Sequence, residues 1–424
     1  MKLTLKHLND AFTLVVLFLA TGAFQSFIVK SETSTALTAG SRSMEAIWAA
    51  VYIVVALRVF QNYRQIWEMI CANNFLLLLV VFAIFSAKWS VAPDLTLRRG
   101  IALFVTTLFG MDFAVRYSIR EQLRLLAIVL GIVVVSGVFM QVLFPGLVPV
   151  VRPLNPGAWI GAFGQKNVFG RMVALTTILM LVLLRRSLSS LWKGAFIVLA
   201  GLALTIVAKS MTALLVLIAL LLFLAFSGLL TWRWKFAFVA RFLLAVIAVP
   251  LVYAVAISWD YLLALLGRDV TLTGRAELWT FSIANISEHP LLGHGYNAFW
   301  NVAREALWFN IQMNWNVPHA HNAFLELALE LGVIGLALFL GSYFISLRRA
   351  FTYMRTNPER EAIWPIIYLL FVFLYSFTEG QIATPNSMLW ILYVAATCAV
   401  TQLVPVRVVS PASDFMAEEA IGVV

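Results

Sequence analysis

Apolar runs of membrane-spanning length follow one another through most of this chain, and they limit its fold more than any other feature. A helix needs about 17–25 mostly apolar residues to cross the hydrocarbon core of a bilayer. Hydrophobic residues make up 62% of the 424 residues and charged residues 12%, unlike the balance in a soluble domain. Because backbone groups inside a bilayer must find partners within the protein, the runs predict helices. The sequence therefore predicts an all-α polytopic membrane protein.

Hydropathy windows predict about twelve transmembrane helices and one large polar loop. The predicted helices lie at residues 10–28, 44–60, 73–88, 100–117, 122–144, 167–185, 191–207, 209–228, 236–256, 321–347, 361–379 and 386–403. This pattern divides the chain into an N-terminal transmembrane bundle of about nine helices, the loop, the C-terminal transmembrane helices and a tail. The four parts cover residues 1–256, 257–320, 321–403 and 404–424.

The polar loop is expected to contain short helices. Its segment Thr273-Gly274-Arg275-Ala276-Glu277-Leu278-Trp279 is typical of a helix start. We expect this helix to lie along the membrane surface with Leu278, Trp279 and Ile283 on its apolar side. Trp279 is also one of several aromatic residues in the loop, which either stack on sugar rings or sit at the membrane interface.

The distribution of basic residues predicts the orientation of the chain. The formal charge is +10, and a cytoplasmic N-terminus would place eighteen of the thirty Lys and Arg inside and twelve outside. This excess favours two cytoplasmic termini and a loop on the outer side of the membrane. Basic residues beside spans contact anionic headgroups, so membrane lipids are expected partners. Nucleic acid is not expected as a partner, because no basic stripe is interleaved with aromatic residues.

The outer cations are numerous enough to indicate a negatively charged ligand on that side. Arg275 is the first candidate, because a guanidinium offers paired donors that match phosphate oxygens and stays charged at neutral pH. Its alternative role is packing at a helix start, with a surface ion pair to Glu277 or Asp269. The secondary candidates, each alternatively an interfacial cation, are Lys209, Lys166, Arg152 and Arg171.

His321 is the candidate general base of the outer side. It stands at the start of the helix predicted at residues 321–347, where the positive end of the helix dipole opposes imidazolium and leaves the ring able to accept a proton. The alternative is a structural histidine bonded to a backbone carbonyl. Asn322 would orient His321 or an acceptor hydroxyl, or simply cap the helix.

Acidic residues stand near the same junction. Glu326 and Glu330 are one turn apart on one helix, and they either steer His321, bind sugar hydroxyls or pair with an outer arginine. Glu379 and Gln381, at the outer end of the eleventh predicted helix, could reach the same cavity.

Neither a metal nor another cofactor is expected. His319 and His321 could form a pair of metal ligands, but no third ligand stands at a persuasive spacing. Cys71 and Cys398 are too few for a disulfide scaffold or a zinc site.

The order of these segments resembles that of the O-antigen ligase and O-antigen/exopolysaccharide polymerase superfamily of bacterial inner membranes. The likeness spans most of the chain by topology and is concentrated between residues 155 and 336 by motif. The matching residues are Gly164-Gln165-Lys166-Asn167, Thr273-Gly274-Arg275 with Trp279, Pro290 with Gly293 and Gly295, and His321-Asn322 followed by Gly332 and Gly335. The family also has an outer arginine at the start of the eighth span, where this chain has Lys209, a charge without the bidentate fork.

The resemblance implies a GT-C-like membrane enzyme that uses an undecaprenyl-diphosphate-linked glycan as donor on the periplasmic face of the inner membrane. Ligases of this superfamily pass the glycan to lipid A-core, and polymerases pass it to another lipid-linked repeat unit. The glycine turn followed by Phe299-Trp300 and the Gly-Gln-Lys-Asn string are slightly more similar to the exopolysaccharide polymerase branch. The function expected is inverting, metal-independent glycan transfer, with Arg275 as diphosphate ligand and His321 as base. A transporter or flippase of lipid-linked glycan is the alternative, although two similar halves with interrupted helices are not evident.

Overall fold

The computed structural model describes residues 5–25, 42–147, 157–184, 188–231, 275–313, 317–380 and 382–401, and these ranges contain helices and no strands. The α-helices are α1 (Leu5–Ala20), α3 (Arg42–Gln61), α4 (Tyr63–Ala72), α5 (Asn74–Phe85), α6 (Pro93–Arg116), α7 (Ile119–Leu143), α8 (Lys166–Leu183), α9 (Leu188–Val207), α10 (Met211–Thr231), α13 (Arg275–Glu288), α14 (Phe299–Val302), α15 (Arg304–Gln312), α16 (Ala323–Thr356), α17 (Trp364–Ser376) and α18 (Met388–Thr401). Single 3-10 turns occupy Ser86–Lys88, Pro145–Leu147, Gly161–Phe163 and Arg360–Ile363. The all-α class predicted from the sequence is confirmed for these ranges.

Eleven of the twelve predicted segments overlap a helix, and the segment at residues 236–256 lies outside the described residues. Among the described helices, five are long and apolar enough to cross a membrane, namely Ser43–Gln61, Ile119–Leu143, Lys166–Leu183, Ser190–Val207 and Ala323–Thr356. A sixth results if Tyr63–Ala72 and Asn74–Lys88, which meet at 94°, form one broken span. The count of twelve spans stays a prediction.

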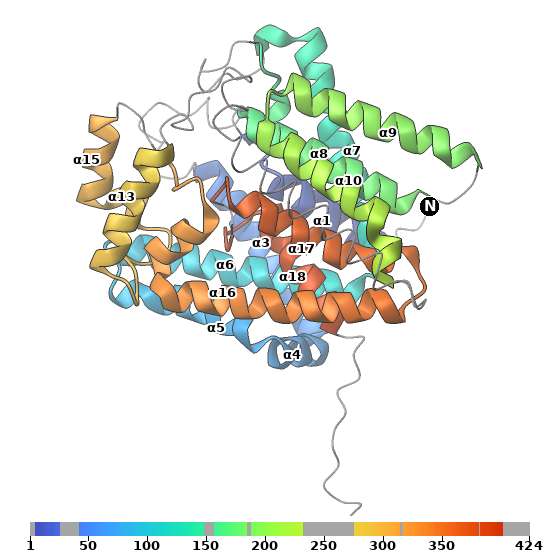
Figure 1. Cartoon of the computed structure of the whole chain (residues 1–424). Coiled ribbons are helices and arrows are strands. Elements are labelled where there is room, and N and C mark those ends of the chain that lie inside the picture. The colour runs from blue at the N-terminus through green and yellow to red at the C-terminus, as the bar shows by residue number, and fades with distance from the viewer. Residues whose placement is uncertain are drawn as a thin grey trace, which may run out of the picture.

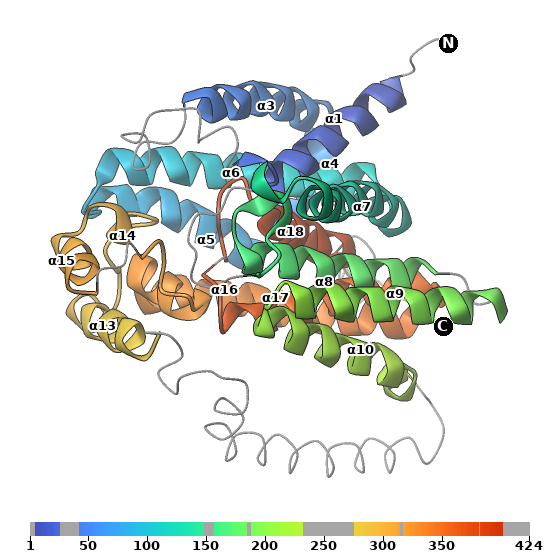
Figure 2. The same ribbon diagram turned by 90° about the horizontal axis from the view of Figure 1, so that it is seen from above.

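The helices form two groups that pack along a shared core (Figure 1). Helices α5, α6, α16 and α18 pack together, and α8, α9 and α10 pack against one another beside them (Figure 2). Close approach of α6 and α18 depends on Gly110, where a Cβ would stand 2.8 Å from Cβ of Val394. The loop helices α13, α14 and α15 gather at the end of the molecule where α16 begins (Figures 1 and 2).

Helix α16 is broken at Gly332, whose φ of 65° and ψ of −169° are not helical. A break leaves backbone groups without partners in the helix, and buried groups of this kind must be satisfied elsewhere. The amides of His294 and Gly295 donate to the carbonyls of Leu329 and Glu330, at 3.0 and 2.9 Å. The turn at residues 290–295 is therefore locked onto the break in α16.

Glycines make this contact possible because the backbone of the 290–295 turn touches the backbone of α16. A Cβ on Gly332 would lie 2.2 Å from the carbonyl carbon of Leu291, and one on Gly293 would lie 2.5 Å from that of Glu330. Both glycines also have positive φ, which L side chains rarely adopt. The glycine motif noted in the sequence thus fixes the polar loop to the long helix.

At the other end of the bundle, a buried carboxylate joins two arginines. Asp112 lies 2.7 Å from Nη2 of Arg58 and 2.6 Å from Nε of Arg116, and the side chains of Asp112 and Arg58 are 1% and 4% exposed. Arg116 also donates to the carbonyl of Arg58 and so ties α6 to the end of α3. The positive-inside count treated both arginines as loop charges, whereas the fold uses them as internal ties.

Only part of the expected apolar side of α13 packs against the protein. Leu278 is fully buried and Trp279 half-buried, whereas Ile283 is 53% exposed. The buried positions of α13 are instead completed by the polar Ser282 and Asn285, whose side chains donate to carbonyls one turn earlier in the same helix. Local hydrogen bonding therefore allows polar residues to face the packed side.

Candidate functional site

Arg275 and His321, which the sequence singled out separately, meet at the carboxylate of Glu379. Nη2 of Arg275 lies 3.9 Å from Oε1 of Glu379, and Nδ1 of His321 lies 3.9 Å from Oε2. The side chains of Arg275, His321 and Glu379 are 18%, 17% and 9% exposed. Arg275 begins α13, His321 precedes α16 and Glu379 follows α17, so three distant segments build one site.

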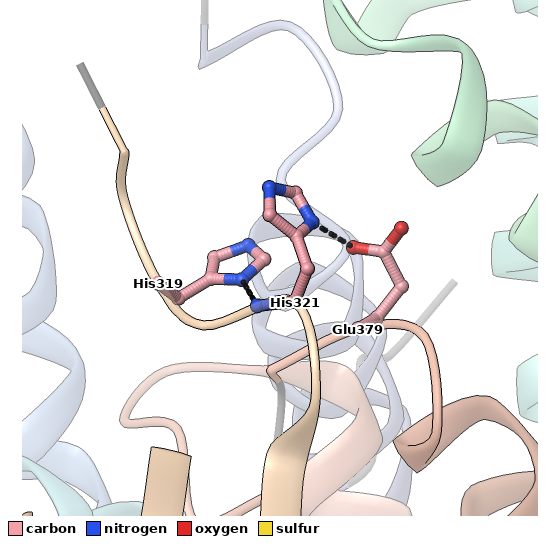
Figure 3. Close-up of side chains that lie close together, drawn as sticks. All are labelled: His319, His321 and Glu379. Atoms are coloured by element: carbon pink, nitrogen blue, oxygen red, sulfur yellow. Dashed lines mark hydrogen bonds and ion pairs between the residues drawn. The ribbon is translucent and has the colours of Figure 1, made fainter. Parts of the chain in front are cut away.

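The two ring nitrogens of His321 have different surroundings (Figure 3). Nδ1 faces the Glu379 carboxylate, and the other ring nitrogen, Nε2, points away from it. His319 lies beside this ring, and its Nδ1 accepts a hydrogen bond from the backbone amide of His321 at 3.1 Å. A general base needs one nitrogen oriented by the protein and the other open to a substrate. In this arrangement Nδ1 faces a carboxylate and Nε2 is directed away from it.

The loop that carries His321 is clamped through the peptide groups of Ala320. The amide of Ala320 donates to Oε2 of Glu326 at 2.6 Å, and its carbonyl accepts from Nε1 of Trp279 at 3.1 Å. Nε1 of Trp300 also donates to the same oxygen of Glu326, at 3.0 Å. Trp279 and Glu326, expected as substrate ligands, thus have partners within the protein.

His321 itself has a strained backbone, with φ of 51°. A residue with a side chain rarely adopts this left-handed conformation, and it persists only where the surroundings impose it. Asn322 follows as the cap of α16, since its side-chain oxygen accepts from the amides of Phe324 and Leu325 at 3.0 and 3.2 Å. The helix therefore starts directly after His321 and directs its positive dipole end toward the ring.

Burial and positive charge keep the imidazoles neutral. Burial, and then the charge of Arg275, lower the pKa of His321 to about 4. Burial lowers the pKa of His319 well below its usual value, and the neighbouring His321, Arg275 and Arg171 add to this. Burial also raises the pKa of Glu379, while Arg171 and Arg275 act against that rise. At neutral pH the ring of His321 is therefore neutral, and Glu379 is the acidic group that faces it.

Glu379 is held from its other side by the start of α8. Oε1 of Glu379 accepts from Nδ2 of Asn167 at 2.9 Å, and Oδ1 of Asn167 accepts from Oγ of Ser210 at 3.2 Å. Asn167 stands in the first turn of α8 and Ser210 directly before α10. The start of α8 therefore contacts the carboxylate directly, and the start of α10 contacts it through Asn167. A helix N-terminus is a favourable position for an anion.

Arg171 lies one turn further along α8 and is 4% exposed. Its guanidinium is 5.9 Å from the ring centroid of Tyr375. Both residues line a cavity of about 20 Å³ that Glu379 also lines, which is room for about one water. Arg171 therefore supplies a further positive charge near the carboxylate.

The remaining predicted cations are placed around this centre or lie outside the described residues. Lys166 is the first residue of α8 and half-buried, and Lys209, directly before Ser210, is exposed with φ of 50°. Arg152 lies outside the described residues, as does Gln381. Glu379 was expected to reach the same cavity as His321 from the outer end of the eleventh predicted helix, and it lies beside His321 and Arg275. The contribution of Ser210 was missed, because nothing local marks a serine that meets α8 only through tertiary packing.

His319, His321 and Glu379 also have the geometry of a possible metal site, since their ligand atoms lie within 4.8 Å of one another. Their surroundings favour an anion instead. Arg275 stands at ion-pair distance from Glu379, and Nδ1 of His319 already accepts a backbone hydrogen bond. Arg171 adds a second guanidinium charge near the carboxylate. A divalent cation would meet two positive charges here, at a cost that a protein usually avoids.

Comparison with known proteins agrees with the motifs. The family model described as O-antigen ligase matches residues 195–340. The chain is 30% identical to the exopolysaccharide production protein ExoQ of Rhizobium meliloti over 348 residues, which cover 77% of each protein. It is 30% identical over 122 residues to a putative polysaccharide ligase of Rickettsia bellii, covering 28% of this chain and 30% of the relative. A putative polysaccharide ligase of Rickettsia conorii is 31% identical over 127 residues, with the same two shares covered.

Proposed function

Because the chain belongs to the O-antigen ligase and exopolysaccharide polymerase superfamily, we propose that it transfers a glycan from a lipid diphosphate to an acceptor hydroxyl. The protein is a multi-pass membrane protein of polysaccharide biosynthesis. The observation that carries the proposal is the meeting of a guanidinium, Arg275, and a neutral imidazole, His321, at one partly buried site.

The reaction needs a positive charge that persists at neutral pH to stabilise the departing diphosphate, and a base that removes the proton of the acceptor hydroxyl. The acceptor oxygen forms the new bond to the anomeric carbon, and the bond from that carbon to the phosphate oxygen breaks with its electron pair. The acceptor proton passes to Nε2 of His321, and the configuration at the anomeric carbon inverts. Arg275 pairs with the oxygens of the departing diphosphate, on which negative charge accumulates.

The cations and helix ends around Glu379 support a diphosphate in this position. Arg275 and Lys166 stand at the starts of α13 and α8, and Lys209 stands just before α10. Helix N-termini and guanidinium groups together form the usual protein environment for phosphate groups. We assign Lys166, Lys209 and the more deeply buried Arg171 to the diphosphate side of the site, with Arg152 as a further candidate in the same outer region.

Donor binding would also raise the basicity of His321. An imidazole with a pKa of about 4 is neutral but a weak base. A diphosphate beside Arg275 would cancel the positive charge that contributes to this low pKa, and its own negative charge would raise the pKa of the ring. The base therefore strengthens when the donor is in place, which is when a proton must be removed.

The wider proposal follows the predicted topology. About twelve spans, with two cytoplasmic termini, place the 257–320 loop and the site on the periplasmic face of the bacterial inner membrane. The donor is an undecaprenyl-diphosphate-linked glycan, and no metal takes part. The relative that covers most of the chain is named for exopolysaccharide production, so we propose another lipid-linked repeat unit as acceptor, with lipid A-core as the second candidate.

The test is glycan transfer by the purified full chain in liposomes that contain lipid-linked donor and acceptor. Replacement of Arg275 or His321 by alanine should abolish chain growth on a gel. Arg304→Ala and His289→Ala change exposed residues of the same loop region and serve as matched controls. A donor moved across the bilayer without any change in length would indicate a transporter and overturn the proposal.

A further inference from the structure

We propose that Glu379 is the positioning residue of the base: its carboxylate fixes the Nδ1–H tautomer of His321, leaves Nε2 free of its proton for the acceptor, and stabilises the imidazolium that forms. This inference rests on the proposed function and adds a second residue to its chemistry.

The two oxygens of the Glu379 carboxylate have separate tasks. Oε1 accepts from Asn167 at 2.9 Å and lies 3.9 Å from Arg275, whereas Oε2 lies 3.9 Å from Nδ1 of His321. Arg275 can therefore turn toward a diphosphate without taking away the oxygen that faces the ring. The separation of 3.9 Å exceeds a hydrogen bond, and such catalytic contacts commonly tighten when substrate binds.

A carboxylate beside Nδ1 determines which nitrogen carries the proton. An ionised carboxylate only accepts hydrogen bonds, so it favours the tautomer with hydrogen on Nδ1. Nε2, which points away from Glu379, then holds the lone pair (Figure 3). When the acceptor hydroxyl gives its proton to Nε2, the ring becomes positive next to a negative oxygen, which lowers the energy of that state.

Three polar groups favour the charged form of Glu379 and act against burial, which raises the pKa of its carboxyl group. They are Arg171 of α8, Arg275 of α13 and Asn167, which donates a hydrogen bond to Oε1. The cavity beside Arg171 has room for about one water that would solvate the carboxylate.

The charged and titratable groups that face His321 come from four segments. They are Arg275 of α13, His319 of the same loop, Glu379 after α17 and, near the carboxylate, Arg171 of α8. Among these groups, Glu379 is the one whose negative charge lies at ion-pair distance from the ring.

The packing gives Glu379 the rigidity that a positioning residue needs. A Cβ on the next residue, Gly380, would lie 3.1 Å from Nδ1 of His319, so the segment after α17 rests directly on the histidine loop. A small movement of either segment would separate the carboxylate from the ring.

The experiment compares the pH dependence of kcat, and the donor KM, for glycan transfer by the full chain with Glu379→Gln, Glu379→Asp and Asn167→Ala. Glutamine keeps an oxygen that can accept from Asn167 and removes only the charge. We expect Glu379→Gln to lower kcat about 100-fold and to move the acidic limb of the profile to lower pH, because the imidazolium loses a stabilising charge. Glu379→Asp should return the limb to its wild-type position. Asn167→Ala should move the limb far less than Glu379→Gln, because it leaves the carboxyl group beside the ring.

Wild-type kcat and an unmoved limb for Glu379→Gln would overturn the inference. Equal losses of kcat for Glu379→Gln and Asn167→Ala, with the acidic limb unmoved in both, would also overturn it. Both effects would then come from the loss of a structural contact alone. Failure of the proposed function is a separate result, because it would appear as undiminished transfer by His321→Ala.

Discussion

Glu326 accepts a hydrogen bond from the backbone amide of Ala320 at 2.6 Å, so a carboxylate on α16 holds the peptide that precedes His321. Trp279 holds the carbonyl of Ala320 from the opposite side, and Trp279 belongs to the helix that begins with Arg275. Arg275 and His321, the proposed diphosphate ligand and the proposed base, are thus connected through one clamped residue. Their relative position depends on this clamp as much as on their own side chains.

This clamp leads to a prediction about Glu326. Glu326→Ala should lower kcat for glycan transfer about 100-fold with a smaller change in donor KM, because displacement of a base by about 1 Å costs this much. Glu326→Gln, which keeps an oxygen acceptor for the amide of Ala320, should restore most of the rate. A change confined to KM would mean that Glu326 binds substrate instead.

The break in α16 predicts that Gly332 cannot be replaced. Gly332→Ala would place a Cβ 2.2 Å from the carbonyl carbon of Leu291 at a φ of 65°. We expect a loss of about 1–3 kcal/mol or more in unfolding free energy, measured by thermal unfolding in detergent. Gly131→Ala is the matched control, because the nearest atom to its Cβ is the flexible end of Met180 at 3.9 Å. Equal effects of the two substitutions would contradict the lock between α16 and the 290–295 turn.

The buried carboxylate of Asp112 predicts a stability effect far from the site. Asp112→Ala leaves Arg58 buried without its partner, which typically costs about 3–5 kcal/mol. Thermal unfolding should register this loss. Glu45→Gln breaks an exposed pair with Arg98, whose side chains are 57% and 69% exposed, and should have almost no effect. A loss of stability no larger than that of the control would show that the buried pairing of Asp112 with Arg58 does not stabilise the fold.

The pKa of His321 predicts a pH dependence of stability. Because the pKa is lowered from 6.5 to about 4 in the folded protein, the unfolded chain binds more protons between these values. Stability should be complete above about pH 6.5 and should fall as the pH decreases toward 4, by about 3 kcal/mol from this group. His321→Gln should flatten the unfolding curve in that window, and a curve of unchanged slope would contradict the buried neutral ring.

The fold class was predictable because the length of an apolar run has a direct physical meaning in a bilayer. The helix starts at Arg275 and at Ala323 followed from local turn and capping signals, and so did the choice of Arg275 and His321. The break at Gly332 was not predicted, because a glycine inside an apolar run gives no sign of the loop that approaches it.

The remaining parts of the site depend on tertiary contacts. Asn167 lies in α8 and Ser210 directly precedes α10, and only packing of α8 against α10 brings them together. The same applies to Arg58 and Asp112, since charge counting along the chain cannot tell a loop arginine from a buried partner. The burial of Ser282 in α13 was not predicted, because apolar periodicity ignores the local hydrogen bond that lets this serine face the core.

The most direct test of the central claim is glycan transfer in liposomes by the purified chain carrying Arg275→Ala or His321→Ala. If these side chains bind the departing diphosphate and remove the acceptor proton, each variant should lose at least about 100-fold in turnover while it still folds. Full turnover by both variants, with Arg304→Ala and His289→Ala equally active, would contradict the account.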